Sequence, residues 1–136
     1  MQRRSTRPGS GVAAVLLVVL VSAVLAVAVH EAAHVAVARR YGGRLRGLVV
    51  RPPFLAVRIE QAGMPARACA LVALAGPAGD LGLLACALAL AHVGVLDRTA
   101  CVYASLWPAA SALCNLLPIP RADGWRALHA LRALPS

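Results

Sequence analysis

Two histidines and a glutamate form the most compact group of chemically active side chains in this sequence. His30, Glu31 and His34 make an H-E-x-x-H pattern in a chain with only four histidines and two glutamates among 136 residues. On a helix, residues four apart share one face, so both imidazoles can bind one metal ion. The glutamate beside them can act as general base on a metal-activated water. The pattern predicts a hydrolytic centre with one Zn²⁺ per chain; the alternative is a polar helix end that simply reaches a membrane interface.

The composition around this pattern indicates a membrane environment. Hydrophobic residues make up 60% of the chain and charged residues 14%, whereas a soluble domain carries about 25% charged residues. The net charge of +9 comes from arginines that flank apolar stretches. We therefore expect contact with the lipid bilayer and its anionic headgroups, and no nucleic-acid partner.

Three apolar blocks must position the chemical group. They cover about 11–39, 67–92 and 99–117, and each is near the roughly 20 residues that cross a bilayer as a helix. We expect one domain, residues 1–136, in an all-α membrane protein with three transmembrane helices. The first block is too long for a cleaved signal peptide. Residues 1–10 are expected to be a disordered tail.

Two shorter segments complete the expected fold. Residues 44–51 and 54–60 read as strands around Pro52 and Pro53, which predicts a short β-hairpin between the first and second spans. Its edge could pair with an extended substrate. Leucine or tryptophan recurs at every third position from 125 to 134, a spacing that suits an amphipathic helix on the membrane surface.

A catalytic zinc needs a third protein ligand and an open position. The remaining candidates are acidic residues or histidines: Glu60, Asp80, Asp97, Asp123, His92 and His129. The first and third spans run parallel, so their carboxyl-terminal ends lie on the same side. Asp123 follows the third span there, whereas Asp97 falls on the opposite side and Asp80 would need a deep site. The two histidines have no partner at ligand spacing and are expected at the interface.

The segment that contains Asp123 resembles a known family motif. Asn115, Pro118, Asp123 and Gly124 lie in N-L-L-P-I-P-R-A-D-G, which is similar to the N-x-x-P-x-x-x-x-D-G motif of the site-2 protease family. With H-E-x-x-H in an earlier helix the resemblance covers about residues 15–130. It implies an intramembrane zinc metalloprotease with Asp123 as third ligand and an active site toward the cytosol. It also suggests single-span membrane proteins, such as anti-sigma factors, as substrates.

The middle span carries a further, imperfect match. The run A-G-P-A-G-D resembles the family element G-P-x-x-N, with Asp80 where the family usually has asparagine. We expect that carboxyl group to be neutral or paired. Gly76 and Pro77 could open space beside the metal or form an ordinary kink. With Asp80, Asn115, Pro118 and Gly124 they are the candidate substrate-contacting or site-shaping residues.

Arginine counts predict the orientation. Ten arginines flank the side that holds the carboxyl ends of the first and third spans, and four flank the other side. The side richer in arginine is normally cytosolic. This places the site at the cytosolic face of what composition suggests is a bacterial cell membrane. Arg3, Arg4 and Arg7 favour the opposite orientation.

The sequence thus predicts peptide-bond hydrolysis in or near transmembrane segments of membrane proteins, with Glu31 as the base. A catalytically silent zinc-binding membrane scaffold is the main alternative, and a metal carrier would need more ligand clusters than the single one visible. The substrate identity and the oligomeric state do not follow from the sequence.

Overall fold

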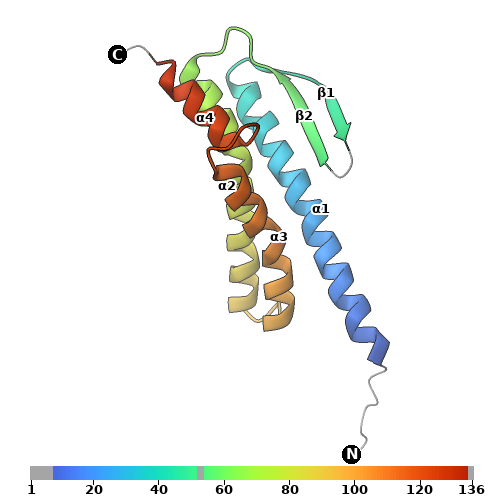
Figure 1. The fold of residues 1–136 in the computed structure, drawn as a ribbon. Helices are drawn as coiled ribbons and strands as arrows, with labels where there is room; N and C mark the ends of the chain where they lie inside the picture. Colours follow the sequence, from blue (N-terminus) through green and yellow to red (C-terminus); the bar gives the residue numbers. More distant parts are fainter. Residues whose placement is uncertain (1–7, 52–53, 135–136) are drawn as a thin grey trace, which may run out of the picture.

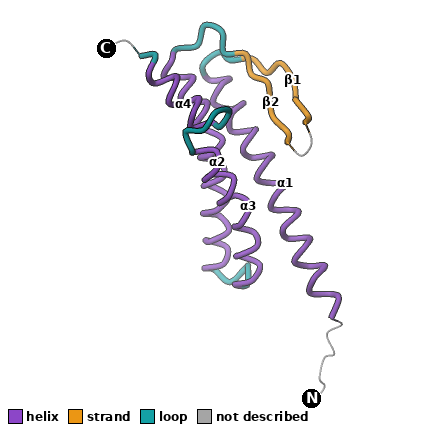
Figure 2. The backbone as a smooth tube through the Cα atoms, viewed as in Figure 1, coloured by secondary structure: helices purple, strands orange, loops and turns teal. Residues whose placement is uncertain are grey.

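Four helices and one small sheet make up the structure, a computed structural model that describes residues 8–51 and 54–134. Helix α1 is followed by a β-hairpin and then by three further helices (Figures 1 and 2). The expected strands are confirmed, while Pro52, Pro53 and the first seven residues of the expected tail lie outside the described residues. The elements are α1 (Pro8–Arg40), β1 (Arg44–Arg51), β2 (Phe54–Glu60), α2 (Ala66–His92), α3 (Arg98–Leu116) and α4 (Asp123–Arg132).

The expectation of three membrane-spanning helices is wrong by one. In the part of the chain that the structure describes, two helices, α1 and α2, are long and apolar enough to cross a membrane. Helix α3 is helical over nearly the expected range, but it carries Arg98, Ser105, Ser111 and Asn115 among its apolar residues. These polar groups lower its hydropathy below that of the other two helices, so the protein is a mainly helical chain with two candidate spans.

Small residues allow α1 and α2 to approach each other closely. Ala26 and Ala38 of α1 are completely or almost completely buried. A Cβ atom built on Gly79 of α2 would lie only 3.2 Å from Val29 Cγ1 and 3.3 Å from Ala33 Cβ. Backbones approach in this way in membrane helices because interfaces of glycine and alanine leave no bulky side chain between them. The close contact brings the histidine face of α1 against α2.

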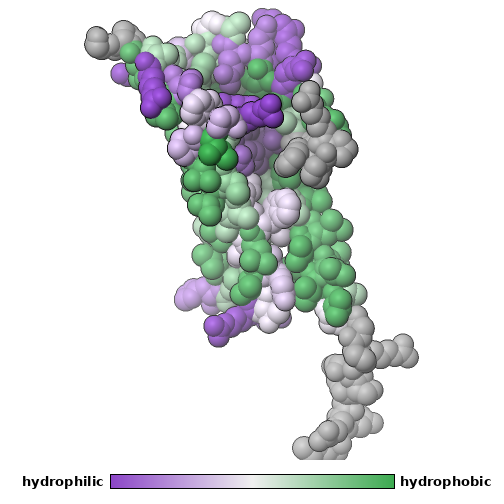
Figure 3. All heavy atoms as spheres, in the orientation of Figure 1, coloured by the Kyte–Doolittle hydropathy of each residue, from purple (hydrophilic) through white to green (hydrophobic). Residues whose placement is uncertain are grey.

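Apolar side chains cover the outer surface of the long helices (Figure 3). Leu16, Leu17 and Leu20 of α1 are each more than 60% exposed. Polar groups are most frequent at the end of the molecule formed by the hairpin and α4, and a smaller polar group lies at the opposite end (Figure 3). Figure 1 shows the carboxyl end of α1, the hairpin and α4 together at that end, with the α2–α3 turn at the other.

The predicted carboxyl-terminal helix is confirmed as α4, which begins at Asp123 and packs against α2. Gly124 explains how closely α4 follows α3. A Cβ atom on this glycine would collide with the backbone carbonyl of Leu116 and lie 2.9 Å from the Leu117 oxygen. Between the two helices Arg121 adopts a left-handed backbone conformation with φ of 78°, which is costly for a non-glycine residue. The tight turn is therefore what directs Asp123 inward.

Candidate metal centre

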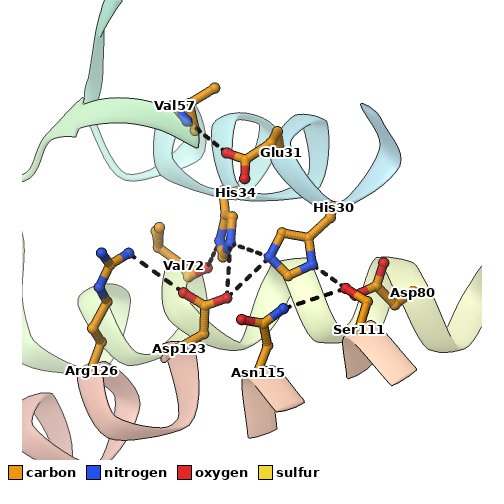
Figure 4. A network of polar contacts seen from close by, with 10 residues as sticks. All are labelled: His30, Glu31, His34, Val57, Val72, Asp80, Ser111, Asn115, Asp123 and Arg126. Carbon is orange, nitrogen blue, oxygen red and sulfur yellow. Dashed lines mark hydrogen bonds and ion pairs between the residues drawn. The ribbon is translucent and has the colours of Figure 1, made fainter. Parts of the chain in front are cut away.

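The structure brings His30, His34 and Asp123 together in the interior (Figure 4). The two histidine Nε2 atoms lie 3.1 Å apart. Asp123 Oδ2 lies 3.1 Å from His30 Nε2 and 3.3 Å from His34 Nε2. All three residues are at most 7% exposed. Two of them come from one face of α1 and the third from the first turn of α4, 89 residues later than His34 by their numbering.

The outer nitrogen of each histidine has a partner that fixes its proton. His34 Nδ1 lies 2.6 Å from the carbonyl oxygen of Val72, which can only accept a hydrogen bond. His30 Nδ1 lies 2.8 Å from Asp80 Oδ2, and because a carboxylate oxygen can only accept, this ring nitrogen is assigned as the donor. A neutral imidazole has one N–H, so both Nε2 atoms then direct a lone pair toward Asp123. Three electron-pair donors face one another without a hydrogen between them, an arrangement that a cation stabilises.

The separations suit a small tetrahedral metal ion. Zinc binds imidazole nitrogen at about 2.0–2.1 Å and carboxylate oxygen at about 2.0–2.2 Å, which places neighbouring tetrahedral ligands about 3.3–3.4 Å apart. The observed edges of 3.1–3.3 Å come close to this without rearrangement. Two imidazoles and one carboxylate are also the donor set of catalytic zinc sites with a fourth position left open.

Gly76 leaves the space that such an ion requires. A Cβ atom on this residue would collide with His34 Nε2 and would lie 2.5 Å from His30 Nε2. Real Cβ atoms do not approach other atoms so closely. The bare backbone of α2 thus forms one wall of the centre, and the next residue, Pro77, is fully buried beside it. Proline has no backbone N–H, so Pro77 leaves the carbonyl oxygen of Ala73 without its helical donor. The neighbouring carbonyl of Val72 is the one that contacts His34.

Asp123 is held as a carboxylate. Burial raises the pKa of its carboxyl group, but when a proton on the imidazoles takes the place of a cation, hydrogen bonds and charge interactions with His30 and His34 outweigh burial and hold the pKa well below its usual range. The position at the start of α4 favours a negative charge as well, because the helix dipole is positive there. Arg126 adds a longer contact of 3.5 Å to Asp123 Oδ1. The oxygen that faces the histidines is therefore free to bind a cation.

Glu31 lies beside the histidine pair but does not join the cluster of three. Its Oε2 accepts a hydrogen bond of 2.7 Å from the backbone N–H of Val57 in β2. Figure 4 shows this carboxylate on the same α1 turn, linked to the hairpin rather than to the candidate ligand atoms. The candidate base is thus adjacent to the centre and in contact with a strand edge at the same time.

A second polar layer surrounds His30. Ser111 Oγ donates to Asp80 Oδ2 at 2.7 Å, and Asn115 Nδ2 donates to Ser111 Oγ at 3.4 Å. Asp80 is therefore paired with His30, as expected of a costly buried carboxyl group, and it lies behind the candidate ligand atoms rather than among them. Asn115 is linked to Asp80 through Ser111. Pro118 is exposed in the turn after α3.

The other candidate ligands have separate roles at the surface. Glu60 forms an ion pair of 2.5 Å with Arg46 across the hairpin, which lowers the pKa of the glutamate. Asp97 caps α3 by accepting a hydrogen bond of 2.8 Å from the Ala100 amide. His129 stacks on Trp125. His92, like His129, is exposed at the end of a helix. None of these four acidic or histidine side chains belongs to the cluster of His30, His34 and Asp123.

Sequence reasoning missed Ser111 and the carbonyl of Val72. Ser111 had a usable signal, because it precedes Asn115 by four residues and shares its helix face. A backbone carbonyl gives no such signal.

In comparisons with known proteins, the chain matches no family model and no curated protein.

Proposed function

We propose that this protein is an intramembrane zinc metalloprotease of the site-2 protease type. The observation that carries the proposal is the buried triangle of His30 Nε2, His34 Nε2 and Asp123 Oδ2, with edges of 3.1–3.3 Å. A glutamate lies next to the first histidine on the same helix turn. This combination is the donor set and base of zinc proteases.

The membrane location is supported by the distribution of apolar side chains. Exposed leucines and valines follow α1 from Val12 to Leu25, and contiguous exposed apolar surface of this kind marks a site of contact with a membrane or another protein. Contact with lipid removes the free-energy cost of exposing these apolar side chains to water. We assign the arginine-rich end, which holds the hairpin and α4 (Figure 1), to the cytosolic side on the basis of the arginine count. The metal centre lies toward that end, because its ligand Asp123 is the first residue of α4.

The residues of the chain then divide the work of hydrolysis. Zinc, when bound, supplies a Lewis acid for the scissile carbonyl and for the attacking water. His30, His34 and Asp123 hold it with one position open. Glu31 removes the proton of the water and delivers it to the leaving amine. Burial excludes bulk water, which strengthens each of these electrostatic interactions.

The outer edge of β2 offers a place for an extended substrate. β1 pairs with one side of β2, and the Val57 N–H on the other side reaches Glu31. A substrate strand along this edge would hydrogen-bond to β2 and bring its peptide bonds next to the base. A transmembrane substrate has to unwind locally to do so, which favours single-span proteins with weak helices.

The edge proposal can be tested by Val57→Pro, which removes this N–H at an edge position that tolerates proline. Cleavage should fall while bound zinc stays constant, measured on the same purified sample. Leu48→Pro in β1, directly opposite in the hairpin register, serves as control for general damage to the hairpin. Full cleavage by Val57→Pro would remove β2 from the substrate path.

One observation favours a second candidate, a zinc-binding scaffold without turnover. The Glu31 carboxylate is already hydrogen-bonded to Val57, and a base that stays there could not serve the water. Under this reading the triangle would have a structural role. The two candidates differ in whether Glu31 matters for any reaction.

The deciding experiment compares the two glutamates of the chain. Wild type, Glu31→Gln and Glu60→Gln are purified in detergent, analysed for zinc and incubated with a single-span reporter substrate in liposomes. The proposal expects one zinc per chain in all three, cleavage by wild type and Glu60→Gln, and none by Glu31→Gln. Equal cleavage by both variants would refute the role of Glu31. Zinc binding without cleavage by wild type would favour the scaffold.

A further inference from the structure

Asp80 is a completely buried acidic residue that the proposed hydrolysis does not use. Its exposure is 0%, and its Oδ1 atom has no hydrogen-bond partner among the described residues. A buried carboxyl group is costly unless its interactions compensate. Its Oδ2 atom makes two short contacts, to His30 Nδ1 at 2.8 Å and to Ser111 Oγ at 2.7 Å. The residue is thus tied to the metal centre from behind.

These contacts form a series of hydrogen bonds that starts at Asn115, and the donor in each bond can be assigned from that end. Asn115 Nδ2 can only donate, so Ser111 Oγ accepts from it. The Ser111 hydroxyl hydrogen then goes to Asp80 Oδ2. That same oxygen accepts from His30 Nδ1. Three helices therefore contribute to one chain of bonds from α3 through α2 to α1, and its last bond places the proton of His30 on Nδ1.

We propose that Asp80 is the positioning residue of the metal centre: through its contact with His30 Nδ1 it holds this imidazole in the tautomer and orientation that directs the Nε2 lone pair at the ion. Ser111 and Asn115 hold Asp80 in turn. The proposal rests on the proposed zinc centre, and it assigns a role to the aspartate that departs from the family pattern.

An acidic residue suits this role better than an amide. Both oxygens of an ionised carboxyl group accept hydrogen bonds, so either one enforces a donor at His30 Nδ1. An asparagine presents an oxygen on one side and an NH₂ group on the other, and the NH₂ group facing His30 would favour the wrong tautomer. Partners that orient metal-binding histidines typically contribute 10–100-fold to metal affinity.

His34 is positioned by different means. Its Nδ1 contacts the Val72 carbonyl, which belongs to the backbone and cannot be removed by a side-chain substitution. Asp80 is therefore the accessible test of histidine positioning. The isosteric change Asp80→Asn keeps the volume at this fully buried position, and Ser111→Ala perturbs the carboxyl group indirectly. Ser105→Ala is the matched control, because Ser105 Oγ is buried in the same helix and has no hydrogen-bond partner in the part of the chain that the structure describes.

The experiment measures Zn²⁺ affinity by competition with a chelator on the full chain in detergent, together with thermal unfolding of the zinc-free protein. We expect Asp80→Asn to weaken zinc binding by about 10–100-fold. Ser111→Ala should bind zinc more weakly than Ser105→Ala does, and the unfolding temperature of the zinc-free variants should change little. Should Asp80→Asn fold poorly, the comparison of the two serine variants decides.

The outcomes separate this inference from the function on which it rests. If wild type binds one zinc and Asp80→Asn and Ser111→Ala bind it equally well, the positioning role is refuted and the zinc centre stands. A loss of thermal stability in these variants with unchanged zinc affinity also refutes it, because Asp80 would then be purely structural. If wild type binds no zinc, the proposed function itself fails and the positioning role with it.

Discussion

Gly76 provides the sharpest prediction, because the space it leaves coincides with the proposed ion site. In Gly76→Ala the new Cβ would collide with His34 Nε2 and lie 2.5 Å from His30 Nε2. To reach the 3.4 Å of an ordinary contact, the His30 ring has to move by about 0.9 Å. Metal–ligand distances are maintained within about 0.2 Å. The substitution therefore displaces the ligands by several times the tolerance of the site.

The expected magnitudes differ for zinc binding and for folding. We expect zinc affinity to fall by at least about 100-fold, the upper end of what outer-sphere substitutions cost. Overpacking costs about 1–3 kcal/mol, whereas replacing glycine by alanine inside a helix contributes up to about 1 kcal/mol. The zinc-free variant should thus lose at most about 2 kcal/mol of unfolding free energy. Binding is impaired far more than the fold.

The assay is Zn²⁺ competition with a chelator on detergent-solubilised protein, with unfolding followed on the zinc-free form. Gly82→Ala is the matched control, because Gly82 lies on the same helix and a Cβ there meets nothing within 4 Å. The control should keep wild-type zinc affinity and gain about 0.5–1 kcal/mol in stability. If Gly76→Ala binds zinc as tightly as Gly82→Ala, the ion does not lie between the two imidazoles and α2.

The remaining predictions concern Asp123 and the turn before it. Asp123→Ala should abolish tight zinc binding, whereas Asp97→Ala should keep it and lose about 1 kcal/mol of stability with the α3 cap; equal zinc content in both would exclude Asp123 as ligand. Gly124→Ala should lower stability by about 1–3 kcal/mol and weaken zinc binding, since the α3 carbonyls lie where its Cβ would be; unchanged affinity would contradict this. Arg121→Gly should relieve about 1–2 kcal/mol of left-handed strain against an entropy cost of about 0.5–1 kcal/mol for glycine. The unfolding temperature should therefore rise while zinc affinity stays unchanged.

Much of the site could be predicted from the sequence because its spacing is local. Helix periodicity alone places His30 and His34 on one face, and the parallel course of α1 and α3 brings Asp123 to the same end. The hairpin was predicted with its observed bounds, since two β-branched runs flank a pair of prolines. These features depend on neighbours in the chain or on simple topology.

What could not be predicted depends on three-dimensional packing. The role of Asp80 behind His30 requires knowledge of how α2 is rotated against α1, and the contact of Glu31 with Val57 requires the hairpin to fold back on α1. The number of spans was overestimated because length was weighed more than polarity in residues 99–117. Sequence spacing carries no information on helix rotation or on strand placement.

The central claim is that one zinc ion binds between α1 and α4. X-ray absorption at the zinc edge, measured on the purified full chain, tests it directly. The account predicts one zinc per chain with two imidazole nitrogens at about 2.0–2.1 Å and further oxygen ligands at about 2.0–2.2 Å, a signal lost in Asp123→Ala. A chain that retains no zinc, or a zinc bound by sulfur from the four free cysteines, would contradict it.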